Sequence, residues 1–322
     1  MTNSGNSLPD YNANPVSNIE LVIPRHLAGL RLDQALHRLL PEFSRSRLQN
    51  WIRASRVWQN DLPAVAKHKV WGGEKIRLAV QPAAEALAHL PEKIPLEIVY
   101  EDAVLLVVNK PPGLVVHPGS GNWRGTLLNA LLQHAPQLAH IPRAGIVHRL
   151  DKETSGLLVV AKTLASQTCL TRQLQERTVK REYQALVHGK MKTGGKVQAP
   201  IGRHPAKRTK MAVVARGKPA VTHYQVIERF ATCTLLRCSL ETGRTHQIRV
   251  HLQSIGHPLV GDPLYSPRNK EPAFPRQALH ACRLSLQHPV AGKTMSWRVA
   301  APPDFLQLLS ALRAQSAGKE PR

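Results

Sequence analysis

The chain is short of acidic residues. Its 322 residues include 21 Asp and Glu but 44 Lys and Arg, so the formal net charge is +23. An excess of this size repels itself unless a polyanion lies nearby, and it therefore indicates nucleic acid or an anionic membrane surface as the partner. The hydrophobic content of 42% excludes a largely disordered chain, because it is enough to build a core.

Other absences narrow the class of protein. No apolar run approaches the roughly 20 residues of a membrane span, and the polar start of the chain carries no secretory signal pattern. The four cysteines form no C-x-x-C pair, which argues against a disulfide framework and a cysteine-built zinc site. The sequence has no H-E-x-x-H motif and no glycine-rich phosphate loop, so we expect no metal and no nucleotide-driven chemistry. We predict a cytoplasmic protein that binds nucleic acid and no membrane.

Changes in composition divide the chain into five parts. We expect a disordered leader over 1–18, a small basic unit over 19–80, a linker rich in Ala and Pro over 81–95, a large unit over 96–314, and a tail over 315–322. The large unit contains many short apolar runs and few helical patterns. This pattern predicts an α+β fold with a mixed, mainly antiparallel β-sheet that is bent and flanked by helices and loops.

The apolar runs and the helical spacings give expected bounds for the elements of the large unit. We expect strands at 97–109, 113–116, 145–148, 156–161, 182–187, 221–227, 232–240 and 247–252. We expect helices at 126–134, 166–176 and 304–313.

The small unit is expected to be α+β and basic. Leucines at helical spacing predict a helix that Pro41 ends, Ser44 can cap a second helix, and two short strands flank a turn near 59–61. The unit carries 11 Lys and Arg against five acids. Arginine binds phosphate oxygens in pairs, which favours an RNA-binding face, although a solvated basic helix is the alternative. The candidate RNA-binding residues are Arg31, Arg45, Ser46, Arg47 and Arg53.

Aspartate is scarce, with only seven in the chain, and Asp151 stands apart from the others. It lies in a polar turn between two apolar runs, 145–148 and 157–161. A carboxylate on a tight loop between core strands is held rigidly yet reaches solvent, as site residues often do. The spacing alone fits equally well an Asp that caps the turn by bonding to the backbone near Thr154.

Several motifs in a fixed order resemble one enzyme family. Residues 148–156 (HRLDKETSG) are similar to the signature of the RluA family of RNA pseudouridine synthases. Its other motifs are matched by residues 109–118 (NKPPGLVVHP), 180–185 (KREYQA), 241–251 (ETGRTHQIRVH) and 256–262 (GHPLVGD). The likeness runs over about 19–301. Residues 203–211 and 217–224 resemble the RluD branch in particular, and 19–80 resembles the small RNA-binding module (αL motif) of a ribosomal small-subunit protein.

The resemblance implies the pseudouridine synthase fold and the isomerisation of uridines in one stem-loop of large-subunit (23S) ribosomal RNA. No electrons or groups enter or leave in this reaction, so it needs no cofactor. The matched positions make Asp151 the catalytic carboxylate, Arg249 its partner, and Tyr183 the ring that packs on the target base. Arg149 matches the residue that fills the space of the flipped-out nucleotide. From the pattern alone Arg249 could also be an ordinary strand arginine, Tyr183 a core tyrosine and Arg149 a plain loop arginine.

One stretch of the large unit carries charge of a single sign. Residues 183–227 hold nine Lys and Arg and no acid, which indicates a track for RNA phosphates. The cluster within it is Arg203, Lys207, Arg208 and Lys210. The expected partner is large-subunit ribosomal RNA or a pre-50S particle, and the resemblance suggests a monomer.

Two other functions are weighed against this one. A non-catalytic RNA-binding or assembly factor could keep the fold, but it would not need Asp151, Tyr183 and Arg249 together. A histidine-based ribonuclease would need a pair of histidines placed for that work, and the sequence shows none.

Overall fold

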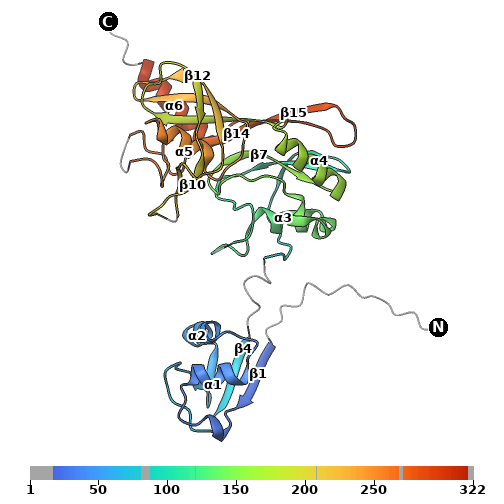
Figure 1. Ribbon diagram of the computed structural model, residues 1–322, viewed down its shortest axis with the longest axis vertical. Coiled ribbons are helices and arrows are strands. Elements are labelled where there is room, and N and C mark those ends of the chain that lie inside the picture. Colours follow the sequence, from blue (N-terminus) through green and yellow to red (C-terminus); the bar gives the residue numbers. More distant parts are fainter. Residues whose placement is uncertain (1–16, 81–87, 120, 208, 268–270, 318–322) are drawn as a thin grey trace, which may run out of the picture. The chain divides into compact units, whose positions relative to one another are not determined.

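The computed structural model describes residues 17–80, 88–119, 121–207, 209–267 and 271–317. The chain forms two compact units, Met1–Leu87 and Ala88–Arg322, each with its own helices and strands (Figure 1). Most of the expected leader, half of the expected linker and residues 318–322 of the expected tail lie outside the described residues. The described ends are more ordered than expected, because Ser17 begins a strand and the last helix continues to Ala317.

The N-terminal unit is a small antiparallel sheet with two α-helices. Its strands are paired in the order β1-β4-β2-β3. Its elements are β1 (Ser17–Val22), η1 (Arg25–Leu27), α1 (Leu32–Leu39), α2 (Arg45–Arg53), β2 (Val57–Gln59), β3 (Leu62–Pro63) and β4 (Lys75–Val80). The core of this unit lies between the helices and the sheet and is built from residues such as Leu36, Leu48, Ile76 and Leu78.

Local chemistry explains where these elements begin and turn. The Ser44 hydroxyl accepts a hydrogen bond from the Arg47 backbone N–H at 3.3 Å, and so caps α2 as expected. Asn60 and Asp61 both take the left-handed conformation, with φ of 51° and 63°. These two residues therefore close the hairpin of β2 and β3, as the sequence predicts.

The large unit is a nine-stranded sheet with helices on both faces (Figure 1). Its strands are β5 (Glu97–Glu101), β6 (Leu105–Lys110), β7 (Ser155–Ala161), β8 (Lys180–His188), β9 (Gly195–Gln198), β12 (Val221–Arg229), β13 (Cys233–Leu240), β14 (Leu279–Gln287) and β15 (Thr294–Arg298). Its helices are α3 (Leu127–His134), η3 (Pro136–His140), η4 (Pro142–Gly145), α4 (Leu164–Gln175), α5 (Gln247–Ser254) and α6 (Pro303–Ala317). A separate hairpin joins β10 (Ile201–Arg203) to β11 (Met211–Val213).

The sheet is mixed and mainly antiparallel, as predicted. Its order is β5-β6-β7-β14-β8-β13-β12-β9, β15 pairs with β14, and only β7 and β14 run parallel. Alternate residues of the strands face opposite sides. One face, with Tyr183 of β8, packs against α3 and α5, and the other packs against α4 and α6. None of the described helices is both long and apolar enough to span a bilayer.

The structure corrects several expected elements. Residues 247–252 form most of the helix α5 and not a strand. Residues 113–116 and 145–148 make only isolated bridges, Val115 to Thr126 and Ile146 to Val160. The strands β9, β10, β11, β14 and β15 were not expected, and the expected strand at 97–109 is two antiparallel strands, β5 and β6. Half of the expected linker packs into the large unit, because the Asn129 side chain donates to the carbonyls of Ala88 and Leu90.

Candidate active site

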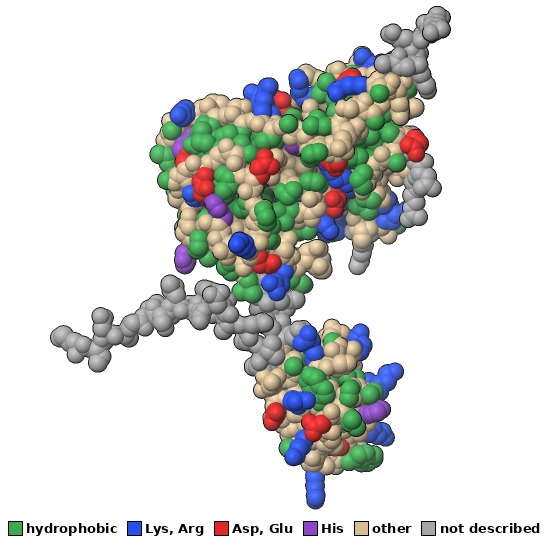
Figure 2. Space-filling view, turned by 180° about the vertical axis from the view of Figure 1, so that it is seen from behind, with side chains coloured by type: hydrophobic (Ala, Val, Ile, Leu, Met, Phe, Trp, Pro, Cys, Tyr) green, Lys and Arg blue, Asp and Glu red, His purple; other side chains and the backbone are tan. Residues whose placement is uncertain are grey.

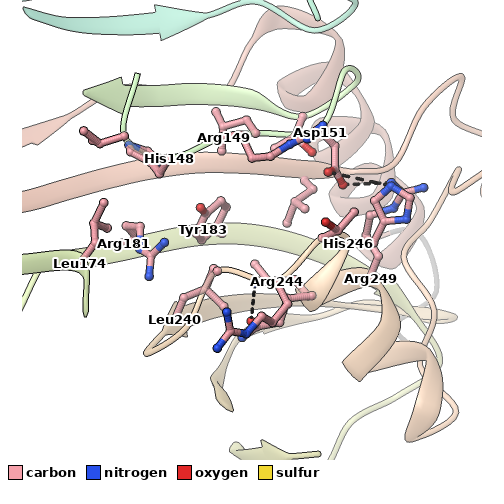
Figure 3. Close-up of a pocket in the computed structure, with 18 of the residues that line it drawn as sticks. His148, Arg149, Asp151, Leu174, Arg181, Tyr183, Leu240, Arg244, His246 and Arg249 are labelled. Carbon is pink, nitrogen blue, oxygen red and sulfur yellow. Dashed lines mark hydrogen bonds and ion pairs between the residues drawn. The ribbon is translucent and has the colours of Figure 1, made fainter. Parts of the chain in front are cut away.

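A pocket of about 300 Å³ opens on the side of the sheet that carries Tyr183 (Figure 3). Three segments that are distant in the sequence line it: the loop before β7, the first residues of β8, and the turn that leads into α5. These segments include four of the residues that the motifs predict, namely Arg149, Asp151, Tyr183 and Arg249. The sheet therefore brings the separate motifs to one place.

The Asp151 carboxylate points to the side chains of Arg249 and His246 and not to the backbone. Its Oδ2 accepts a hydrogen bond from Arg249 Nη1 at 2.9 Å, and its Oδ1 lies 4.0 Å from His246 Nε2. The bond to Thr154 N–H that a capping Asp would accept is instead accepted by the Asp151 backbone carbonyl, at 3.0 Å. The loop therefore closes through its backbone, which leaves the carboxylate free to act in the pocket.

Arg249 is shared between two carboxylates. Its Nε and Nη2 donate to Asp262 at 2.7 and 2.9 Å, and Nη1 is left for Asp151. Burial alone would lower the pKa of Arg249, but the hydrogen bonds and charge of Asp262, with the charge of Asp151, raise it above its ordinary value. The paired bonds to Asp262 fix the plane of the guanidinium, and so fix the direction in which it meets Asp151.

The loop that follows Asp151 is held by its carbonyl groups. Lys110, which is almost fully buried, donates from Nζ to the carbonyl of Lys152 at 2.9 Å and to two carbonyls of its own loop. Arg276 donates to the carbonyl of Glu153 at 3.0 Å. Burial lowers the pKa of Lys110 to about 7. Lys110 and Arg276, which come from other elements, therefore fix the backbone that carries Asp151.

Gly156 allows β14 to approach this loop closely. Its φ is +113°, and a Cβ at this position would lie 2.2 Å from the carbonyl oxygen of Ala281 on β14. Only glycine fits both the backbone conformation and the space. Gly156 therefore ties the end of the HRLDKETSG motif to the centre of the sheet.

A second chain of contacts reaches Asp151 from the β10–β11 hairpin. Tyr265 Oη accepts from the Met211 backbone N–H at 2.9 Å and lies 2.8 Å from His246 Nδ1. Burial lowers the pKa of His246, which favours the neutral ring. A neutral ring with its proton on Nε2 satisfies both contacts, because Tyr265 then donates to Nδ1 and Nε2–H faces the Asp151 carboxylate.

Tyr183 lies on the floor of the pocket, in β8, between β13 and β14. It is 5% exposed, and burial raises the pKa of its hydroxyl, with a further contribution from the charge of Asp151. Its ring stays neutral and presents a flat surface beside the carboxylate. Arg149, by contrast, is exposed at the pocket rim, next to Asp151 in the loop (Figure 3).

Two candidate RNA-binding residues of the N-terminal unit share one acid. Arg31 and Arg45 both bond to the fully buried Asp33, at 3.0 and 2.9 Å between Nε and the carboxylate. Arg47 lies over the rings of Phe43 and Trp51. The arginines remain partly exposed, and Figure 2 shows Lys and Arg side chains projecting from several sides of this unit.

The other candidates of this unit lie along α2. The Arg53 guanidinium bonds to Asn50 at 2.6 Å, and the Ser46 hydroxyl lies 3.1 Å from that of Ser44. The structure therefore places four of the five candidates on α2. The fifth, Arg31, lies beside the first turn of α2, because it bonds to the same carboxylate, Asp33, as Arg45 does.

The basic cluster of the large unit lies on the β10–β11 hairpin and its turn. Arg203 and Lys207 are exposed, and Arg208 lies outside the described residues. Lys210 is packed, because Nζ donates to the carbonyl of Leu264 and lies over the Tyr265 ring. The exposed cations Arg203 and Lys207 thus form a surface, whereas Lys210 packs against Tyr265 and supports the chain of contacts to His246.

The sequence did not single out Asp262, His246, Tyr265 or Lys110 as site residues. Asp262 had a signal, because it ends the matched motif at 256–262 and is one of only seven aspartates. Lys110 lies in the matched motif at 109–118. No signal in the sequence pointed to Tyr265, because its role depends on where the β10–β11 hairpin places Met211.

Comparisons with known proteins place the chain in a family. The family model for RNA pseudouridylate synthase matches residues 104–254. A protein of Nitrosomonas europaea named ribosomal large subunit pseudouridine synthase D is 60% identical over 92% of this chain and 88% of its own length. Proteins of the same name from Neisseria meningitidis serogroup B and Escherichia coli O157:H7 are 56% and 52% identical, over 92% and 89% of this chain and 83% and 91% of their own.

A solved structure shares the fold. Human RNA pseudouridylate synthase domain containing 1 is 28% identical, covers 73% of this chain and 98% of its own, and superposes with a TM-score of 0.53. The second human protein of this kind, domain containing 4, gives the same identity and TM-score over 71% and 95%. The chain belongs to the RluA family of RNA pseudouridine synthases.

Proposed function

We propose that this enzyme converts uridines of large-subunit ribosomal RNA to pseudouridine with Asp151 as the reacting carboxylate. The observation that carries the proposal is the buried Arg249, which Asp262 orients and which bonds to Asp151 inside the pocket. The names of the relatives support the substrate class. The resemblance to the RluD branch makes a more detailed prediction, namely that the enzyme modifies several uridines of one stem-loop.

The reaction breaks the N1–C1′ bond, turns the base and joins C5 to C1′; C5 loses a proton and N1 gains one, so the net change is an isomerisation. It needs an ionised carboxylate at the junction of sugar and base, as retaining glycosidases use at an anomeric carbon. Burial would favour the protonated acid, and the guanidinium of Arg249 opposes this. The same carboxylate can attack the sugar, attack the base or remove a sugar proton.

The target uridine has to leave its stack, which costs a few kcal/mol. Arg149 is exposed beside Asp151, so its planar guanidinium can occupy the vacated space or contact the flipped nucleotide. Tyr183 gives the base a ring to pack on. These two contacts would return part of the cost of flipping.

The RNA is held by charge outside the pocket. The arginines of α2 and the exposed cations of the β10–β11 hairpin, Arg203 and Lys207, offer two basic surfaces. Binding of phosphates to such surfaces weakens steeply as salt rises, so the affinity for RNA should fall with added salt. A cytoplasmic location, a monomeric state and action on free RNA or on a pre-50S particle stay predictions.

One assay separates the proposal from its two rivals. The protein is incubated with large-subunit RNA from a strain that lacks the modification, and pseudouridine is mapped. Conversion supports the proposal, chain cleavage points to a ribonuclease, and binding without conversion points to an assembly factor.

The variant Asp151→Asn tests the assigned role. It should abolish conversion and leave RNA binding nearly unchanged, since Arg249 keeps both bonds to Asp262. Asp61→Asn is the matched control, because it makes the same chemical change in the β2–β3 turn of the N-terminal unit. Turnover by Asp151→Asn near that of the control would refute the assignment.

A further inference from the structure

One buried cation of the pocket, Arg181, has no carboxylate partner among the described residues. Arg181 on β8 is 7% exposed, and its Nε is buried without a hydrogen bond. Within the described part of the chain no carboxylate forms an ion pair with it. Arg249 and Arg276 are about as buried, and each has a paired carboxylate, Asp262 or Asp304.

Leaving a buried guanidinium unpaired is costly, because its charge has lost water and gained no acceptor. Such a group is expected where a ligand supplies the acceptor. Arg181 lines the pocket, and its side chain lies on the same face of β8 as Tyr183, two residues along the strand. The missing acceptor therefore belongs to the substrate side of the pocket.

Gly243 makes room for this guanidinium. A Cβ built on Gly243 would lie 2.8 Å from Arg181 Nη1, and the backbone there is not in the left-handed region. The glycine is needed for space and not for conformation. Arg181 and Gly243 together form one end of the pocket.

The opposite end holds Asp151, and Figure 3 shows Tyr183 between the two. If Asp151 acts at C1′ and the base packs on Tyr183, the edge of the uracil farthest from the sugar extends toward Arg181. That edge carries O4, which accepts hydrogen bonds. A guanidinium only donates, so it matches this oxygen and opposes the amino group that cytosine carries at the same position.

We propose that Arg181 recognises the target base by donating to O4 of the flipped-out uracil, in the space that Gly243 leaves open. The inference rests on the proposed function, since it takes the sugar to lie at Asp151. It assigns a specificity-determining role within the pocket, separate from the reacting carboxylate.

The test uses a stem-loop RNA with either uridine or its 4-deoxy analogue, in which hydrogen replaces O4, at the target position. Single-turnover conversion and Kd are measured for the wild type, Arg181→Met and Gly243→Ala. We expect the wild type to prefer uridine by about 10- to 100-fold in kcat/KM, the effect of one hydrogen bond from a charged donor. Both variants should lose most of this preference, because the first removes the donor and the second displaces it.

The controls separate base recognition from charge and from folding. Arg237→Met removes an exposed cation of the neighbouring strand, and Gly119→Ala adds a methyl group where nothing lies within 4 Å. Both should keep the preference. If Arg181→Met does not fold, Gly243→Ala still decides, because the group it displaces is the end of a flexible side chain.

An equal loss of activity on both RNAs in Arg181→Met or Gly243→Ala would overturn the proposal and indicate a phosphate contact or a structural role. A wild-type enzyme that does not distinguish the two RNAs would overturn it as well. Failure of the proposed function is a different result, namely full turnover by Asp151→Asn.

Discussion

Replacing Asp262 by Asn should show whether catalysis depends on the orientation of Arg249 as well as on its presence. The carboxylate accepts from Nε at 2.7 Å and from Nη2 at 2.9 Å, and both side chains are almost fully buried. An amide of the same shape accepts only one of these bonds and turns its own NH₂ toward the other donor. Arg249 then keeps its charge but loses the fork that fixes its plane.

The cost follows from these two bonds. Losing one hydrogen bond to a charged group costs about 1.5–3 kcal/mol, and weakening a buried ion pair brings the total to about 3–5 kcal/mol. For a unit of this size about 3 kcal/mol lowers Tm by roughly 6–12 °C. A misplaced group near the reacting atoms costs about 100-fold in rate, so kcat should fall by this order while RNA binding changes little.

Release of tritium from RNA labelled at uridine C5 measures kcat, because the C5 hydrogen leaves when C5 joins C1′. Asp102→Asn is the matched control: Asp102 accepts from Tyr100, from His288 and from backbone N–H groups, and it does not line the pocket. The control should lower Tm and leave kcat of the folded protein unchanged. If Asp262→Asn kept the wild-type kcat, or if the two variants lost kcat equally, the orientation argument would be wrong.

Three further predictions concern the neighbours of this site. Burial lowers the pKa of His148 to about 3, so below pH 6.5 the unfolded chain binds a proton at this residue that the folded protein does not bind. The free energy of unfolding therefore falls as the pH drops below 6.5, by about 2 kcal/mol at pH 5. His148→Gln should show a flatter pH dependence of Tm. Tyr265→Phe should lower kcat several-fold at unchanged RNA affinity, since His246 loses its Nδ1 partner, whereas an altered affinity with normal kcat would contradict this. Gly156→Ala should leave little folded large unit by circular dichroism, because the methyl group meets the carbonyl of Ala281.

The fold class and the main motifs could be predicted from the sequence because both rest on local patterns. Two helices and a hairpin in the N-terminal unit follow from leucine spacing, a cap and an Asn-Asp turn. The matched motifs named Asp151 and Arg249, and the structure places them 2.9 Å apart. The scarcity of acids made Asp151 easy to find.

The helix α5 shows why the rest could not be predicted. Ile248, Val250 and Leu252 alternate with polar residues, which is the pattern of a half-buried strand. In the structure every residue from 247 to 252 of this helix is buried, Gln247, Arg249 and His251 included, so this part has no polar face to set a helical period. The polar residues are there to bond to other elements, and such long-range partners leave no mark on local spacing.

The order of strands has a consequence for synthesis of the enzyme. The strand β14 lies between β7 and β8 in the sheet, although ninety residues, 189–278, separate it in sequence from the end of β8. The two halves of the pocket, Asp151 before β7 and Tyr183 on β8, are therefore joined by a strand that is synthesised long after both of them. The N-terminal unit has all its described pairings within residues 17–80 and can fold long before. A nascent chain would complete the N-terminal unit first and could complete the pocket only after β14 has been synthesised.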